Sequence, residues 1–337
     1  MIKFAIIGLG NIGKRHANII LDNLESELVA ICDVLPASKT GWKYAQIPYF
    51  NSIGKMFSSH IQIDVVNICT PNGLHAQQAI ESLSNNCHVV IEKPMALSKT
   101  EAENIIFKAF QMSRQVFVVM QNRYSPPIKW LKQIIDKNVL GQVMMVQVNC
   151  YWNRDDNYYI PGGWHGTMNM DGGTLFTQFS HFVDIMYWLF GDVKNIRSSF
   201  KNFIHNHSTE FEDSGTVIFD FVKGGIGSLN FSTATWNKNM ESSITVLGEN
   251  GALKIGGQYM DKVEYCHINE YKMPKLKPVN PPNDYGAYKG SASNHEYVIE
   301  NVIKTLNNDA EVGTNALEGL KVVDIIERIY NRKNNNF

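Results

Sequence analysis

A glycine pattern close to the N-terminus constrains the fold more than any other feature. Gly8, Gly10 and Gly13 have the spacing G-x-G-x-x-G, directly after an apolar run and at the start of a helical stretch. In such a strand–turn–helix unit the first glycine permits a tight turn, the second lets a pyrophosphate approach the backbone, and the third lets helix and strand pack closely. The pattern therefore predicts a dinucleotide site at a helix N-terminus, with Asn11 and Ile12 in the same loop.

A carboxylate stands where the ribose of a dinucleotide is expected. Asp33 lies 20 residues after Gly13 and ends an apolar run that begins at Val29. A carboxylate at this place accepts hydrogen bonds from ribose hydroxyls and repels a 2′-phosphate. The sequence therefore predicts NAD, rather than NADP, as the cofactor.

Apolar runs alternate with helical stretches through the first third of the chain. The alternation predicts right-handed crossovers and a doubly wound parallel sheet, the Rossmann fold. The runs expected to form buried strands are residues 2–7, 29–33, 64–70, 88–91 and 115–120.

The pattern changes after residue 122. Hairpin-like strands predict an antiparallel sheet, packed with helices at residues 125–137, 174–189, 293–307 and 314–331. The strands are expected at residues 141–152, 193–203, 213–222, 225–236, 242–247 and 252–255. We therefore expect two domains, residues 1–122 and an α+β domain over residues 123–337.

Composition excludes several classes of function. The net charge is -1 and no long Lys/Arg run occurs, so a nucleic-acid footprint is absent. No apolar stretch approaches the length of a transmembrane helix or of a signal peptide, so we expect no membrane association and a cytoplasmic protein. The five cysteines form no C-x-x-C pair, so no metal site is expected.

Two polar motifs follow the third and fourth apolar runs. Glu92-Lys93-Pro94 ends the fourth run, and carboxyl ends of parallel strands face the ligand crevice. Lys93 there can donate a proton or stabilise an oxyanion, and the alternative is a surface lysine.

The third run ends in Thr70-Pro71-Asn72, with His75 one turn later. These residues would lie beside the same crevice and contact cofactor or substrate. The alternative for His75 is an exposed residue at the start of a helix.

A further candidate site lies in the second domain. Gly172-Gly173 follows Asp171 and permits close backbone approach before a helix that carries His181. Histidine titrates near neutrality and suits the proton transfer that accompanies hydride transfer. The alternative is a buried structural histidine.

The chain resembles the Gfo/Idh/MocA family of sugar and polyol oxidoreductases. The resemblance covers nearly the whole chain and implies NAD-dependent hydride transfer, with Lys93 and His181 as the catalytic pair. The motifs that carry it stand in family order: Gly8–Gly13, Thr70-Pro71-Asn72 with His75, Glu92-Lys93-Pro94, and Gly172-Gly173 followed by His181.

Within this family, further motifs are similar to bacterial 3-dehydrogenases of UDP-linked amino-uronic acids. These enzymes oxidise the C3 hydroxyl of UDP-N-acetylglucosaminuronate to a 3-keto sugar, which leads to a 2,3-diamino sugar of surface polysaccharide. The motifs are Gln121-Asn122-Arg123, Trp164-His165-Gly166-Thr167, Asp171-Gly172-Gly173, residues 178–184 and residues 243–251.

The resemblance also implies roles for individual residues. Glu92, Lys93, Gln121, Trp164 and His165 are expected near the cofactor. A UDP-sugar is expected to contact Lys93, His181 and the residues Asn122, Arg123, Asp171, Thr177 and Tyr285. Which of Lys93 and His181 takes the proton stays open. For the segment around Tyr285 the alternative is a solvated connection.

The chain departs from the family pattern at two positions. Polyol dehydrogenases of the family carry Asp four residues before the histidine, where this chain has Thr177, and many relatives carry Arg at the position of His165. Thr177 disfavours the first rival function, a dehydrogenase for a free sugar or polyol such as myo-inositol. The second rival is a non-catalytic NAD-binding regulator, which would need neither Lys93 nor His181.

The resemblance finally predicts the assembly. In the family, an open face of the second domain's sheet buries against a partner, so we expect a homodimer or homotetramer. The strand at residues 225–236 is apolar enough for this role, and the alternative is that it faces covering helices.

Overall fold

The computed structural model describes residues 1–284 and 289–332, and the chain divides into two units. Unit 1 comprises Met1–Met120 and His295–Leu320, and unit 2 comprises Gln121–Asn294 and the chain from Lys321 onward. Each unit therefore contains two segments that are distant in the sequence.

Unit 1 is built on six parallel strands in the order β3-β2-β1-β4-β5-β6. This confirms the predicted doubly wound sheet, whose strand order reverses between β1 and β4, the place where such sheets bind ligands. The strands are β1 (Ile2–Ile7), β2 (Ser26–Cys32), β3 (Tyr49–Phe50), β4 (Val65–Ile68), β5 (His88–Ile91) and β6 (Val116–Val118).

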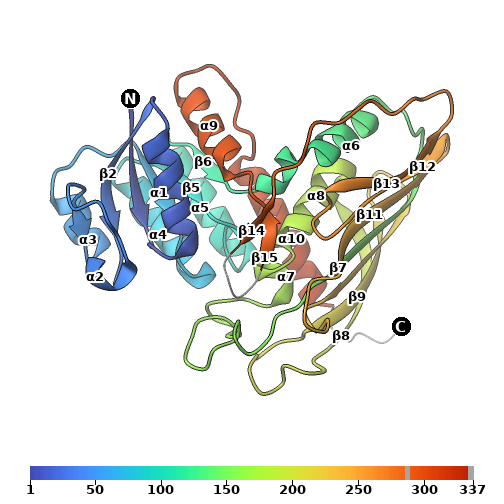
Figure 1. Cartoon of the computed structure of the whole chain (residues 1–337), viewed down its shortest axis with the longest axis horizontal. Coiled ribbons are helices and arrows are strands. Elements are labelled where there is room, and N and C mark those ends of the chain that lie inside the picture. The colour runs from blue at the N-terminus through green and yellow to red at the C-terminus, as the bar shows by residue number, and fades with distance from the viewer. Residues whose placement is uncertain (285–288, 333–337) are drawn as a thin grey trace. The chain divides into compact units, whose positions relative to one another are not determined.

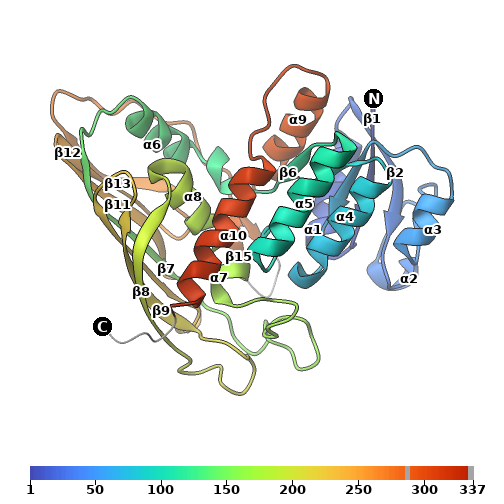
Figure 2. The same ribbon diagram turned by 180° about the vertical axis from the view of Figure 1, so that it is seen from behind.

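Helices cover both faces of this sheet (Figures 1 and 2). Helix α1 (Asn11–Asp22) packs against α9 (His295–Leu306), while α4 (His75–Ser84) packs against α5 (Lys99–Met112) on the other face. The remaining helices are the short α2 (Ala37–Thr40), α3 (Ile53–Ser58) and the 3-10 turn η1 (Asn72–Leu74).

Unit 2 is built on a seven-stranded sheet in the order β13-β12-β11-β7-β10-β9-β8. Its pairs are antiparallel except β7 with β10, which run parallel, so the predicted, mostly antiparallel sheet is confirmed. The strands are β7 (Val143–Tyr151), β8 (Val193–Lys201), β9 (Ser214–Phe221), β10 (Ile226–Ser232), β11 (Glu241–Gly248), β12 (Gly251–Gly256) and β13 (Lys262–Ile268), with a separate pair β14 (Pro282–Asp284) and β15 (Lys289–Ala292).

The sheet of unit 2 has one covered and one open face, as alternation along its strands requires. On β7, Val146, Val148 and Cys150 are buried, whereas Met145 and Gln147 are exposed. Helices α6 (Pro126–Asp136), α7 (Thr174–Thr177), α8 (Ser180–Phe190) and the end of α10 (Ala316–Tyr330) lie on the covered side (Figure 1), and the 3-10 turn η2 (Gln121–Tyr124) packs against α6 and α8.

Aromatic side chains fill the core beneath the covered face. The Trp152 ring lies 5.3 Å from that of Phe179 and 5.7 Å from that of Phe182, and Phe179 lies 5.8 Å from Phe231. Phe231 of β10 therefore faces covering helices, as one reading of this strand anticipated.

Two local expectations differ from the structure. The helix expected at residues 174–189 is broken into α7 and α8, because Phe179 leaves the helical conformation, with φ -119° and ψ 6°, although the N–H of Gln178 still donates to the carbonyl oxygen of Thr174. The strands β3, β13, β14 and β15 were not expected. Among the described helices, none has the length and apolar character that crossing a membrane requires.

Candidate active site

The glycine loop between β1 and α1 has the shape that a pyrophosphate requires. Gly8 has φ +89°, and a Cβ atom there would lie 2.7 Å from the carbonyl oxygen of Cys69. A Cβ atom at Gly13 would lie 1.9 Å from the carbonyl oxygen of Gly8, so glycine lets α1 pack on β1. A Cβ atom at Gly10, the N-cap of α1, would meet nothing within 4 Å. The open side of this loop fits the pyrophosphate of NAD.

Asp33 follows β2, and its carboxylate closes the same loop. One oxygen accepts a hydrogen bond from the N–H of Leu9 at 2.6 Å, and the other accepts from the N–H of Leu35 at 2.8 Å. Each carboxylate oxygen keeps a further lone pair for a ribose hydroxyl. Asn11 is exposed and Ile12 half-buried at the start of α1. Ribose binding by Asp33 stays a prediction.

His75 joins the loops that follow β4 and β5. Its side chain is fully buried, with Nδ1 2.7 Å from the carbonyl oxygen of Pro94 and Nε2 2.9 Å from that of Thr70. Burial lowers the pKa of His75. Pro71 is half-buried and Asn72 is buried in the turn between them. The structure thus gives His75 two backbone contacts, and its contact with the cofactor stays a prediction.

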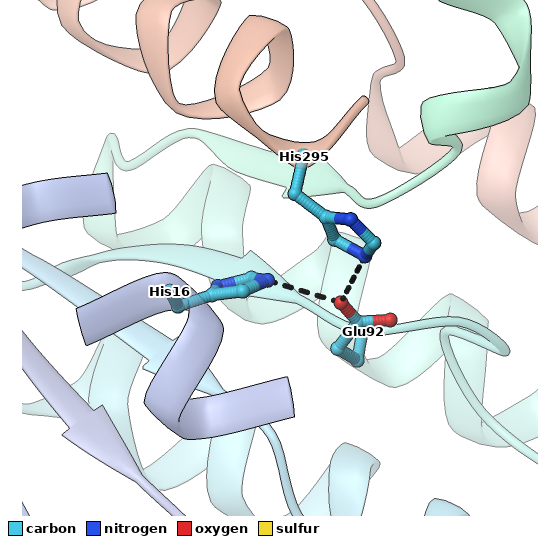
Figure 3. A group of neighbouring side chains, drawn as sticks. All are labelled: His16, Glu92 and His295. Atoms are coloured by element: carbon cyan, nitrogen blue, oxygen red, sulfur yellow. Dashed lines mark hydrogen bonds and ion pairs between the residues drawn. The ribbon is translucent and has the colours of Figure 1, made fainter. Parts of the chain in front are cut away.

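Glu92, the first residue after β5, is buried between two histidines (Figure 3). Its Oε1 lies 3.1 Å from Nε2 of His16 and 3.6 Å from Nε2 of His295, and its Oε2 accepts the backbone N–H of Lys93 at 3.2 Å. Burial opposes ionisation, but the hydrogen bond from His16 and the nearby charge of Lys93 lower the pKa of Glu92 to about 2. The Lys93–Pro94 peptide is cis.

In unit 2, η2 carries the candidates Gln121, Asn122 and Arg123. The Arg123 guanidinium donates to both oxygens of Asp184, at 2.8 and 2.6 Å, and lies 5.0 Å from the ring centre of Trp188. Both charges are buried, so this pair ties η2 to α8. The contact of Arg123 with a UDP-sugar stays a prediction.

Several buried polar atoms beside η2 point to a polar ligand. Both amide atoms of Asn122, Oε1 of Gln121 and Oγ of Ser180 have no hydrogen-bond partner among the residues that the structure describes. The amide nitrogen of Gln121 donates to Ser291 at 3.1 Å. Leaving buried polar atoms unsatisfied costs free energy, so hydroxyl groups of a ligand would offset that cost.

The imidazole of His165 lies in an aromatic stack. Its ring centre is 3.7 Å from that of Trp164 and 4.2 Å from that of Tyr158, and its Nδ1 is 3.7 Å from Oδ2 of Asp171. The side chain is 23% exposed, so one edge of the ring stays accessible.

Asp171 supplies a carboxylate next to Thr177. Its Oδ2 accepts the N–H of Gly166 at 2.8 Å, and its Oδ1 accepts the hydroxyl of Thr177. Asp171 is only 1% exposed. A carboxyl group is therefore present beside Thr177, on the side chain that its hydroxyl contacts.

His181 is the second residue of α8 and is 2% exposed. The preceding short helix α7 begins after Gly173, which has φ +117°, and a Cβ atom there would lie 2.5 Å from the hydroxyl of Tyr330. That hydroxyl accepts the N–H of Leu175 at 3.0 Å and donates to Glu212 at 2.7 Å. Tyr330 thus fixes the start of α7, which precedes the helix of His181.

Sequence reasoning missed the partners that hold these candidates. His16 stands three residues after Gly13 and could have been found by helical spacing. Asp184 lies in the motif at residues 178–184, but its pairing with Arg123 was not predicted, and nothing in the sequence joins His295 or Tyr330 to the site. Tyr285 lies outside the described residues. Lys93 belongs to unit 1 and His181 to unit 2.

Two solved structures resemble the whole chain. The WlbA dehydrogenase from Bordetella pertussis, in complex with NADH and UDP-GlcNAcA, is 31% identical and has a TM-score of 0.84, with 98% of this chain and 96% of that chain covered. The WlbA dehydrogenase from Chromobacterium violaceum, with the same two ligands, has the same identity and TM-score over 98% of this chain and 93% of its own.

Curated relatives agree on the class of protein. Oxidoreductase P35 of Formosa agariphila is 31% identical over 57% of this chain, which spans only 60% of that relative's length. Glucose-6-phosphate 3-dehydrogenase of Bacillus subtilis is 22% identical over 100% of this chain and 97% of its own.

Family models match both units. Residues 2–120 match the oxidoreductase family with an NAD-binding Rossmann fold, and residues 128–254 match the GFO/IDH/MocA C-terminal domain. Together with the glycine loop and the parallel sheet, these matches show that the chain belongs to the Gfo/Idh/MocA family and is an NAD-dependent oxidoreductase.

Proposed function

We propose that this protein oxidises the C3 hydroxyl of UDP-N-acetylglucosaminuronate, a UDP-linked N-acetylated amino-uronic acid, to the 3-keto sugar. The observation that carries the proposal is the similarity, over 98% of the chain, to two dehydrogenases crystallised with NADH and UDP-GlcNAcA. A ketone at C3 is the group that a transaminase needs, so the product would enter synthesis of a 2,3-diamino sugar for surface polysaccharide.

Lys93 and His181 carry the proposed chemistry. Bound NAD supplies the acceptor for the hydride that leaves C3. One of the two side chains removes the hydroxyl proton, so that the C–H and O–H bonds break and the carbonyl forms. The other side chain stabilises the negative charge that develops on the oxygen.

The remaining candidates divide between cofactor and sugar. The proposed NAD contacts are Gly8, Gly10, Asn11, Ile12, Gly13, Asp33, Thr70, Pro71, Asn72, His75, Glu92, Lys93, Gln121, Trp164 and His165. The proposed sugar-nucleotide contacts are Lys93, Asn122, Arg123, Asp171, Thr177, His181 and Tyr285. In this proposal residues 1–122 bind NAD, and residues 123–337 bind the substrate and a partner copy.

The second candidate function is oxidation of a free sugar or polyol. Its support is the full-length similarity to a glucose-6-phosphate 3-dehydrogenase. Asp171, which accepts a hydrogen bond from Thr177, offers an acidic group next to the position where this chain lacks one.

A single-turnover assay decides between the two. Purified protein at a concentration comparable with NAD is mixed in turn with UDP-N-acetylglucosaminuronate, myo-inositol, glucose and glucose 6-phosphate, and the absorbance of reduced nicotinamide is followed. Reduction with the UDP-sugar alone supports the proposal. Reduction only with a free sugar, polyol or sugar phosphate assigns the second function. If the protein binds NAD but reduces it with none of the four substrates, both functions are refuted.

A further inference from the structure

A chain of buried hydrogen bonds in unit 1 ends at the backbone of Lys93. Asn67 of β4 donates from its amide nitrogen to Nδ1 of His16 at 2.9 Å. Because Nδ1 accepts, the proton of a neutral ring lies on Nε2, which donates to Oε1 of Glu92 at 3.1 Å. The other oxygen of Glu92 accepts the N–H of Lys93. No member of this relay of Asn67, His16 and Glu92 is more than 6% exposed.

His295 covers the relay from helix α9 (Figure 3). Its Nε2 lies 3.6 Å from the same oxygen of Glu92, and its ring meets that of His16 edge-on at 5.7 Å. Burial lowers the pKa of His295 to about 3, so the ring is neutral and adds no charge that would compete for Glu92.

The free-energy cost of burying the charged Glu92 argues that this residue does more than pack the core. A buried carboxylate is expensive to desolvate, and apolar side chains of similar volume commonly stabilise a core as well or better. Glu92 instead uses its two oxygens to link the relay to the first N–H after β5. On the far side of Lys93, His75 contacts the carbonyl oxygen of Pro94. The backbone of Lys93 is thus held from both sides.

We propose that His16 is a positioning residue, which acts through Glu92 to fix the backbone from which Lys93 reaches the reacting hydroxyl. This inference rests on the proposed role of Lys93. The lysine stem is long, so a shift of its backbone is carried to the amine, and reacting groups must be held within about 0.5 Å. Loss of such positioning costs turnover more than binding.

The test compares three variants of the full chain. His16→Leu removes both hydrogen bonds of the ring. His16→Gln keeps an amide nitrogen that can donate to Glu92 and an oxygen that can accept from Asn67. Leu83→Ala is the matched control, because Leu83 is fully buried on α4 of the same unit and belongs to no part of the relay. Its loss lowers stability without touching the loop after β5.

Two readouts keep this inference separate from the proposed function. Hydrogen exchange of the peptide that contains Lys93, measured without NAD or sugar, reports the backbone directly. Turnover of the UDP-sugar and the dissociation constant for NADH report the consequence. We expect His16→Leu to speed the exchange and lower kcat about ten-fold or more, with KM and NADH affinity within about two-fold of wild type. His16→Gln should restore both, and Leu83→Ala should change neither.

Three results would overturn the inference. The first is unchanged exchange at Lys93 in His16→Leu, which decides the matter even if the wild type turns over no UDP-sugar and the proposed function fails. The second is faster exchange with unchanged kcat. The third is a stoichiometric divalent metal in the purified protein that is lost in His16→Leu, because the ligand atoms of His16, Glu92 and His295 lie within 4.8 Å of one another and would then form a metal site.

Discussion

At the scale of single residues, most of the proposed NAD contacts in unit 1 lie on other loops than the lysine proposed to react. Lys93→Met removes the amine and keeps an apolar stem, while the glycine loop and Asp33 follow other strands. We expect NADH affinity within about two-fold of wild type and a kcat reduced by about 10²–10⁴, the range for loss of an acid–base group. NADH fluorescence titration and the single-turnover assay measure the two effects.

Lys99→Met serves as the control for this change, because Lys99 is exposed at the start of α5. Lys99→Met should alter neither the NADH affinity nor kcat. A Lys93→Met protein that is folded but has lost NADH binding would place Lys93 in the cofactor site alone.

His295 gives the stability of unit 1 a dependence on pH. The unfolded chain protonates this histidine below its ordinary pKa of 6.5, whereas burial lowers the pKa to about 3 in the folded state. Its contribution is therefore complete above pH 6.5 and is lost as the pH falls from 6.5 toward 3. Glu92 also loses its contribution to stability as the pH falls, but over a lower pH range, between its ordinary pKa of 4.5 and its folded-state pKa of about 2.

The change of pH that isolates His295 is from about 7 to about 5, above the range of Glu92. We expect the wild type to lose roughly 2 kcal/mol more unfolding free energy over this range than His295→Leu does, at about 1.4 kcal/mol per pH unit. Urea unfolding at the two pH values measures the difference. His207→Leu, at an exposed position, should keep the wild-type dependence, and equal slopes in wild type and His295→Leu would show that His295 is not buried neutral.

At the scale of elements, a substitution in the β1–α1 loop can change NAD binding without changing the stability of the fold. A Cβ atom at Gly10 would meet no protein atom within 4 Å, and φ at this position is an ordinary -70°. Gly10→Ala should therefore leave the unfolding free energy within about 0.5 kcal/mol of wild type. Its methyl group would stand where the pyrophosphate is expected, so we expect NADH affinity to fall at least about ten-fold.

Gly54→Ala is the matched control, since a Cβ atom there also meets nothing within 4 Å and the position lies in helix α3. It should keep NADH affinity and gain up to about 1 kcal/mol from helix propensity. Calorimetry and thermal unfolding test both variants. Unchanged NADH affinity in Gly10→Ala would move the pyrophosphate away from this loop.

The elements differ in how far local sequence determines them. Strands of unit 1 are buried on both faces and read as apolar runs, and Ser98 with Glu101 forms the capping box at the start of α5. The parallel pairing of β7 with β10 is not local, because residues 152–225 separate the two strands. The sequence does not reveal the break at Phe179 either, because the Phe179 ring packs on two residues distant in the chain, Trp152, which follows β7, and Phe231 of β10.

The residues of the candidate site also differ in how far local sequence predicts them. The glycine loop and Glu92-Lys93-Pro94 are contiguous, so their spacing alone predicts a place at the carboxyl edge of the sheet. The side chains that orient them come from elsewhere in the chain: His295 reaches Glu92 across 203 positions, and the α9 pattern marks it only as a buried residue. The sequence therefore predicts which residues are candidates for the reaction, but it does not predict the contacts that hold those residues in place.

At the scale of the whole molecule, the open face of the unit 2 sheet bears on the proposed assembly. Ile226 and Leu247 lie on either side of Met145 in register, so their side chains form one row across β10, β7 and β11. Ile226 is 51% exposed, Leu247 38% and Met145 42%. A contiguous apolar row on a solvent-facing sheet marks an interaction surface, and the family resemblance implies a second copy as its partner.

Met145→Asp tests this surface, because it places a charge in the middle of the row without altering the covered face. An unpaired charge buried in an interface costs several kcal/mol, so we expect the dissociation constant of the oligomer to rise about a hundred-fold or more. Sedimentation velocity over a concentration series measures it. Leu24→Asp, at a 93% exposed position of unit 1, should leave the oligomer intact. A wild type that is monomeric at micromolar concentration, or an oligomer that survives Met145→Asp, would show that this face has no partner copy.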